Sequence, residues 1–187
     1  MGTPTKKVAF YTLGCKLNFS ETSTITRDFV KYGFEKVKFD SVADFYVINT
    51  CSVTENADKE AKKLIRKAKR ISPDSKIAVI GCFAQLQPDS LAKLNGVDIV
   101  LGANDKFDLI KYLNETKVEM PTKVIRSDID EVNSFKPSYS MDERTRSYLK
   151  VQDGCDYTCS FCTIPLARGK SRSGTISDTI KAVSYTH

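Results

Sequence analysis

The chain has 187 residues, with 29 lysines and arginines against 23 aspartates and glutamates, and its formal net charge is +6. This length accommodates one full domain and part of another, and the small positive excess is weak evidence for a polyanionic partner. We find no apolar run of membrane-spanning length and no signal peptide, so we expect a cytoplasmic chain without a membrane anchor. In that reducing compartment, six cysteines indicate metal binding rather than disulfides.

The first part of the chain alternates short apolar runs with helical patterns. The apolar runs predict five strands, at Lys7–Leu13, Phe34–Phe39, Asp44–Asn49, Lys76–Ile80 and Val97–Leu101. Helices are expected between them, at 18–32, 52–71, 88–96 and 104–113, the first two opening on the capping-box patterns Asn18-x-x-Glu21 and Ser52-x-x-Glu55. Strands that alternate with helices indicate a parallel sheet covered on both faces. We therefore predict a Rossmann-like or flavodoxin-like five-stranded parallel α/β domain over residues 1–115.

The alternation of strand and helix patterns ends after this domain. Residues 116–145 are mixed and polar, so we predict a linker there, with one extra strand near Lys123–Arg126. A strand at Arg146–Gln152 and a helix at Ser177–Tyr185 are expected to follow. Since a complete domain needs far more chain, residues 146–187 are expected to be only the first strand, loop and helix of a truncated second domain.

Three cysteines, Cys155, Cys159 and Cys162, lie in the loop between that strand and helix in a C-x3-C-x2-C arrangement. Closely spaced thiolates hold zinc or iron–sulfur clusters. Structural zinc needs four protein ligands, and the single histidine, His187, is the last residue. A 4Fe–4S cluster held by three cysteines instead leaves one iron open to a small molecule. A zinc knuckle completed by a distant residue, or cysteines buried as small hydrophobes, are the alternatives.

The other three cysteines, Cys15, Cys51 and Cys82, each follow the end of a predicted strand. The carboxyl ends of parallel strands lie on one edge of the sheet, where open α/β folds bind ligands. The turns and helix starts that follow favour a thiolate. A second cluster with an open iron is the prediction, and three separately buried cysteines are the alternative.

The cysteine loop resembles the signature of the radical S-adenosylmethionine (SAM) enzymes, in which an aromatic residue such as Phe161 usually precedes the third cysteine. Four motifs together resemble the methylthiotransferases: TLGCKLN-x-x-E at 12–21, NTCSVT-x-x-A at 49–57, GCFAQ at 81–85 and DGCDYTCSFCTIPLARG at 153–169. Lys16 and the PLARG stretch are most similar to the branch that acts on threonylcarbamoyladenosine in tRNA. The isopentenyladenosine branch usually has Gln in place of Lys16, and the branch acting on a ribosomal-protein aspartate has Pro.

This resemblance implies a transferase with two 4Fe–4S clusters that uses SAM. It also implies that residues 146–187 are the truncated start of a radical SAM partial barrel. The loop of Cys155, Cys159 and Cys162 would hold the SAM-cleaving cluster. The strand-end set would hold the auxiliary cluster, which carries the sulfur. The implied reaction inserts a methylthio group at C2 of N6-threonylcarbamoyladenosine, at position 37 beside the tRNA anticodon, with electrons from a flavodoxin-like or ferredoxin-like donor. The same chemistry on isopentenyladenosine or a ribosomal-protein aspartate is an alternative, as is a non-catalytic iron–sulfur or nucleic-acid binding fragment. We expect residues 1–187 alone to have little or no activity.

Basic residues beside the cysteine loop are the candidate RNA contacts: Lys150, Arg168, Lys170 and Arg172. The expected helix after Cys51 is also basic on one face, which is more typical of a solvated surface than of a tRNA contact. Asn18, Glu21 and Asn49 are expected to shape turns and satisfy backbone groups.

Overall fold

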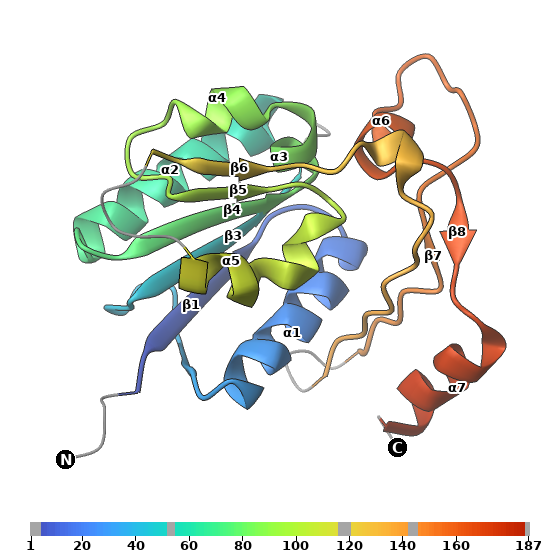
Figure 1. Ribbon diagram of the computed structural model, residues 1–187, viewed down its shortest axis with the longest axis horizontal. Coiled ribbons are helices and arrows are strands. Elements are labelled where there is room, and N and C mark those ends of the chain that lie inside the picture. The colour runs from blue at the N-terminus through green and yellow to red at the C-terminus, as the bar shows by residue number, and fades with distance from the viewer. Residues whose placement is uncertain (1–4, 52–54, 116–120, 142–145, 186–187) are drawn as a thin grey trace.

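A six-stranded parallel sheet forms the centre of the computed structural model, which describes residues 5–51, 55–115, 121–141 and 146–185 (Figure 1). Its strands are β1 (Lys7–Thr12), β2 (Glu35–Val37), β3 (Phe45–Thr50), β4 (Lys76–Gly81), β5 (Ile99–Leu101) and β6 (Lys123–Ile125), in the spatial order β2-β1-β3-β4-β5-β6. The α/β class and parallel pairing are confirmed. The extra strand expected near Lys123–Arg126 is confirmed as β6, but it pairs with β5, so the sheet has six strands rather than the predicted five.

The strand order is that of flavodoxin-like sheets with one strand added at the edge. The chain reverses its direction of travel across the sheet between β1 and β3. Such a switch point leaves a crevice at the carboxyl ends of the strands. Ligand chemistry is therefore expected where β1 and β3 end.

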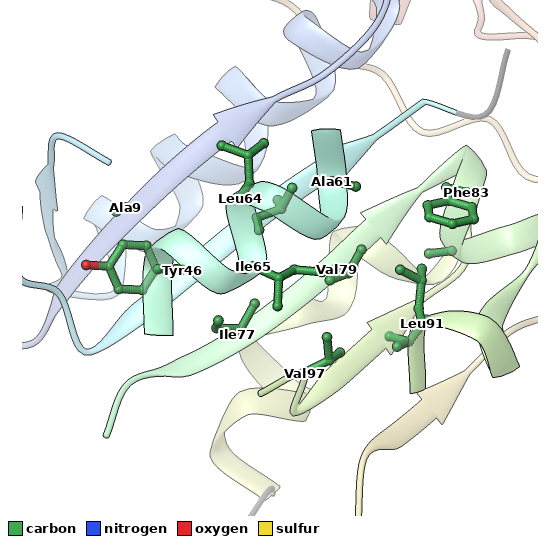
Figure 2. Close-up of a cluster of buried hydrophobic side chains, with 14 of the residues drawn as sticks. Ala9, Tyr46, Ala61, Leu64, Ile65, Ile77, Val79, Phe83, Leu91 and Val97 are labelled. Carbon is green, nitrogen blue, oxygen red and sulfur yellow. The ribbon is translucent and has the colours of Figure 1, made fainter. Parts of the chain in front are cut away.

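Helices cover both faces of the sheet, as their apolar stripes predict. Helices α1 (Lys16–Lys31) and α5 (Leu109–Glu115) lie on one face, and α2 (Glu55–Ile71), α3 (Cys82–Leu86) and α4 (Pro88–Ala92) lie on the other. A short 3-10 helix, η1 (Asp105–Asp108), precedes α5. Figure 2 shows one of the two apolar cores, in which Leu64 and Ile65 of α2 pack with Ile77 and Val79 of β4. Each such fully buried side chain contributes about 1.5–3 kcal/mol to folding.

Helix α1 begins earlier than its capping-box pattern predicts. It starts at Lys16 with Cys15 as the N-cap residue, whose side chain makes no capping hydrogen bond. Asn18 lies inside the helix and donates from Nδ2 to the carbonyls of Leu13 (3.0 Å) and Thr50 (3.1 Å). Asn18 therefore ties the ends of β1 and β3 together, which confirms its expected role at backbone groups. Ser52 lies outside the described residues, so its cap is not described.

The chain after β6 returns along α1. Tyr139 forms an antiparallel bridge with Leu149, and the Tyr139 carbonyl accepts hydrogen bonds from Thr24 Oγ1 (3.3 Å) and Arg27 Nη2 (2.8 Å) of α1. Part of the predicted linker is thus packed on the sheet domain rather than separate from it. A further 3-10 helix, η2 (Ile129–Glu131), lies between β6 and this bridge.

The last part of the chain lies beside the carboxyl end of the sheet, as the orange and red ribbon in Figure 1 shows. It contains β7 (Gln152–Asp153), α6 (Ile164–Arg168), β8 (Arg172–Ser173) and α7 (Ile176–Tyr185). The helix expected at the end is confirmed. The strand expected at Arg146–Gln152 is not present as such, because only Gln152 and Asp153 pair with another strand, the antiparallel β8.

Candidate iron–sulfur site at the carboxyl edge of the sheet

Three cysteines follow three neighbouring strands at this edge. Cys15 comes after β1, Cys51 directly after β3 and Cys82 directly after β4. Since β3 is flanked by β1 and β4, and Thr50 pairs with Gly81 in register, the three strand ends lie side by side. The predicted gathering of this set, here called the rim cysteines, therefore follows from the sheet topology.

Two glycines let the loops that carry the rim cysteines approach one another. Gly14 has a φ of +102°, and a Cβ placed on it would lie 2.5 Å from Cys51 Cβ and 2.9 Å from Cys51 Sγ. Gly81 has a φ of +100°, and its Cβ would lie 2.4 Å from Asn49 Oδ1. Both positions require glycine, because the left-handed conformation and the close contact each exclude a side chain.

The Asn49 amide lies under this edge. Its Nδ2 donates to the Asn18 carbonyl (3.1 Å) and to Thr22 Oγ1 (3.0 Å), which confirms a role at backbone groups. Its Oδ1 is buried and accepts no hydrogen bond from any described residue. A buried acceptor without a partner is costly and calls for an explanation such as strain, a redox role, a water or an ion.

The second set, here called the loop cysteines, comprises Cys155, Cys159 and Cys162. The loop is closed on itself by hydrogen bonds from Cys155 N to the Gly169 carbonyl (3.0 Å) and from Cys162 N to the Cys159 carbonyl (3.0 Å). The rings of Tyr157 and Phe161 project from it into solvent. The loop therefore presents thiols and aromatic groups at its surface, supported by a backbone frame.

The donor set fits iron–sulfur ligation. All six cysteines are present as thiols, and the loop cysteines are exposed or half-buried. The described residues include no group of three or more His, Cys, Asp or Glu side chains already assembled as a metal site. Metal binding is coupled to folding, so the loops that carry the ligands can close further when a metal binds. Six soft donors in two sets of three, with a glycine cradle against Cys51, suit two clusters that each have an open iron.

A cluster of buried charges joins helix α1 and η1 to the part of the chain that carries the loop cysteines. Glu21 of α1 accepts from Lys106 Nζ (2.5 Å), Lys150 Nζ (2.9 Å) and Arg168 Nη1 (3.0 Å). Asp153 of β7 pairs with Lys150 Nζ (2.6 Å) and Arg168 Nη1 (2.9 Å). All five residues are buried, and the Glu21, Lys106 and Lys150 side chains are 0% exposed. We call this set the ion cluster.

The charges hold both carboxylates ionised. Burial alone would raise the pKa of Glu21, but Lys106, Arg168 and Lys150 outweigh it and hold that pKa well below its usual value. The pKa of Asp153 is lowered in the same way, with burial opposed mainly by Arg168 and Lys150. Burial would lower the pKa of Arg168, yet Glu21 and then Cys82 raise it well above its usual value. For Lys106, burial prevails over Glu21 and lowers the pKa.

The ion cluster corrects two predicted RNA contacts. Lys150 and Arg168 are both 4% exposed and paired with carboxylates, so neither can reach a phosphate. Lys170 is exposed. The Arg172 side chain is 10% exposed, pairs with Asp153 (3.5 Å) and donates to the carbonyls of Ser134 (3.0 Å) and Arg168 (2.6 Å). The RNA contact therefore remains a prediction for Lys170, whereas Arg172 is engaged by protein groups.

The expectation that Glu21 satisfies backbone groups is wrong, because its carboxylate oxygens accept hydrogen bonds from the side chains of three cationic residues. A signal for this was present in the sequence. Glu21, Ile25 and Phe29 follow one another at the i, i+4, i+8 spacing of the buried stripe of α1, and all three are buried. A carboxylate on such a stripe requires buried cations.

No helix among the described residues is long and apolar enough to cross a membrane.

The chain matches one family model and several curated proteins. Residues 7–102 match the model of the uncharacterized protein family UPF0004. The threonylcarbamoyladenosine tRNA methylthiotransferase MtaB of Aquifex aeolicus is 44% identical over 89% of the chain and 41% of its own length. MtaB of Bacillus subtilis is 41% identical over 93% of the chain and 39% of its own length.

A relative named for another substrate, the ribosomal protein uS12 methylthiotransferase RimO of Trichodesmium erythraeum, is 32% identical over 92% of the chain and 39% of its own length. The chain spans about two fifths of the length of these relatives. The match to the family model covers strands β1 to β5 and all three rim cysteines. The chain therefore belongs to family UPF0004, and its resemblance to the methylthiotransferases is confirmed.

Proposed function

We propose that the chain is the amino-terminal part of a radical SAM methylthiotransferase that acts on N6-threonylcarbamoyladenosine of tRNA. The observation that supports this most is the placement of two three-cysteine sets at one end of the sheet. The rim cysteines follow β1, β3 and β4, and the loop cysteines lie between β7 and α6, which packs on α3. An enzyme that joins a sulfur group to a carbon radical needs two such centres close together.

Each set has its own part in the proposal. Cys15, Cys51 and Cys82 would hold one 4Fe–4S cluster, and Cys155, Cys159 and Cys162 would hold the other together with SAM. When bound, the clusters supply the electron that cleaves SAM and the sulfur that is transferred. The protein residues fix the loops: Gly14 and Gly81 allow the rim loops to approach, and the Gly169 carbonyl holds the loop that begins at Cys155.

The substrate is proposed from the relatives. The two relatives with 44% and 41% identity are named for threonylcarbamoyladenosine, and the uS12 enzyme is more distant at 32%. A tRNA anticodon loop is the corresponding partner, with exposed Lys170 beside the loop cysteines as a candidate phosphate contact. A flavodoxin-like or ferredoxin-like protein is the proposed electron donor.

Nucleoside analysis tests the substrate. We expect mass spectrometry of tRNA from cells that lack the full gene to show loss of the 2-methylthio form of N6-threonylcarbamoyladenosine. The isopentenyl form should be unchanged. A full-length copy should restore the modification, as should Val30→Ser, an exposed control on α1. A Cys82→Ser copy should not. Loss of the isopentenyl form, or of the ribosomal-protein modification alone, would assign a different substrate and refute the proposal.

Iron analysis tests the cofactors. After anaerobic reconstitution, two 4Fe–4S clusters correspond to about eight iron per chain, and Cys82→Ser should leave about four. Stoichiometric zinc in place of iron would exclude radical chemistry. The 187-residue chain alone is expected to give little or no methylthiolation.

A further inference from the structure

The ion cluster joins parts of the chain that are far apart in the sequence. Glu21 is on α1, Lys106 is in η1, and Lys150, Asp153 and Arg168 belong to the last part of the chain. Each of the two carboxylates lies near one cysteine set. Glu21 is on the helix that Cys15 caps, and Asp153 is in the strand that leads into the loop cysteines.

Few buried apolar side chains hold the last part of the chain against the sheet domain. Among the described residues from 146 onward, the buried apolar side chains are Ala167 and Ala182. Two alanines bury little apolar surface. Charged hydrogen bonds are stronger than neutral ones, so the ion cluster is a main link between these parts, beside the ring contact of Phe19 with Tyr148.

Arg168 restricts the orientation of α6 relative to α1. Its Nη1 donates to Glu21 Oε1 (3.0 Å) and Asp153 Oδ1 (2.9 Å), and its Nη2 donates to Asn18 Oδ1 (2.6 Å) and Glu21 Oε2 (3.1 Å). A planar guanidinium with both ends engaged permits one orientation of α6 relative to α1. The Asn18 that it contacts is the residue that ties the ends of β1 and β3 together.

We propose that Glu21 and Arg168 are positioning residues, which hold the loop cysteines in a fixed orientation toward the rim cysteines. Burying five charges costs desolvation energy that an apolar contact would avoid. Their retention is explained if a unique orientation of the two loops is required. The inference deepens the proposed function and rests on it for the joint use of the two cysteine sets.

Amide hydrogen exchange of the 187-residue chain, read by mass spectrometry, tests this role. In Glu21→Gln, amides of 152–173 should exchange at least about tenfold faster, while those of β1, β3 and β4 stay within about twofold of the wild type. Arg168→Gln should act similarly. Arg168→Lys should recover only part of the protection, because lysine keeps the positive charge but lacks the planar guanidinium that donates at both ends. Asp40→Asn, which removes the carboxylate of an exposed pair with Lys67, is the matched control and should change neither region.

The outcomes separate positioning from stability. Faster exchange across β1, β3 and β4 in the Arg168 variants would show general structural support and overturn the proposal, as would unchanged exchange of 152–173. Arg168 lies outside the sheet, so its variants remain informative if Glu21→Gln does not fold. Iron content is measured in parallel and should stay at about eight per chain in every variant, because all cysteines are kept. Failure of the wild type to bind iron would refute the proposed function and leave the exchange result valid.

Discussion

Replacement of Gly14 by alanine tests how tightly the first rim loop packs on Cys51. The new Cβ would lie 2.5 Å from Cys51 Cβ and 2.9 Å from Cys51 Sγ, at a φ of +102°. Cys51 Cβ is bonded directly to the backbone, so it cannot move aside without moving β3. The left-handed strain is about 1–2 kcal/mol, and overpacking adds about 1–3 kcal/mol. The free energy of unfolding should therefore fall by about 2–5 kcal/mol.

Gly33 provides the matched control. Its φ is +86°, and a Cβ there would meet nothing within 4 Å. Gly33→Ala should therefore cost only the strain of about 1–2 kcal/mol, and the difference between the two variants isolates the contact with Cys51. Urea unfolding under reducing conditions measures both values.

Iron content supplies a second readout for the same pair. Gly14→Ala should displace Cys51 and leave only the loop cluster, with about four iron per chain, whereas Gly33→Ala should keep about eight. Equal destabilisation in the two variants together with equal iron content would refute the reasoning that the rim loops are held in contact by Gly14.

Two further predictions concern the charges near this edge. The pKa of Glu21 is lowered because Lys106, Arg168 and Lys150 outweigh the effect of burial. The ionised Glu21 therefore stabilises the fold above its unfolded-state pKa of about 4.3. This stabilisation is lost as the pH falls through the lower pKa of the folded state. The urea midpoint should therefore fall more steeply below about pH 4.3 in the wild type than in Glu21→Gln, and equal slopes would contradict this. Asp105→Asn should lower the free energy of unfolding by about 1–3 kcal/mol, because Asp105 accepts from both N (2.8 Å) and Oγ (2.6 Å) of Ser127. A loss below about 0.5 kcal/mol by urea unfolding would contradict it.

Long apolar runs made the centre of the sheet predictable. Strands β3 and β4 are buried on both faces, so their sequences are continuously apolar and mark them clearly. Strand β6 has three residues, half-buried and exposed in alternation, and its place in the sheet depends on pairing with β5. The segment before the loop cysteines has a strand-like sequence, yet Tyr148 and Lys150 bond to the chain at Ser138–Ser140 through an isolated bridge rather than a long strand. Sequence periodicity does not identify the pairing partner.

The site was predictable where its members are unusual and close to recognisable elements. Cysteines at strand ends and in a short loop are rare enough to be noticed, and the topology then brings the rim set together. The ion cluster was not predictable in the same way, because Arg168 and Glu21 are separated by 147 positions and charged residues are mostly exposed. The sequence therefore predicts Lys150 and Arg168 as RNA contacts at the surface, whereas the tertiary structure buries both.

Helix α1 connects the two halves of the site. Cys15 caps it, Asn18 holds the ends of β1 and β3 and also accepts from Arg168, and Glu21 receives three cations. Both cysteine sets are thus connected through side-chain contacts to the first two turns of one helix. That helix packs on the sheet through Ile25 and Phe29. A helix deforms little over two turns, so the relative placement of the two sets depends on the few side chains that attach them to it. Substitutions at these turns should therefore disturb the relation between the sets before they disturb either set alone.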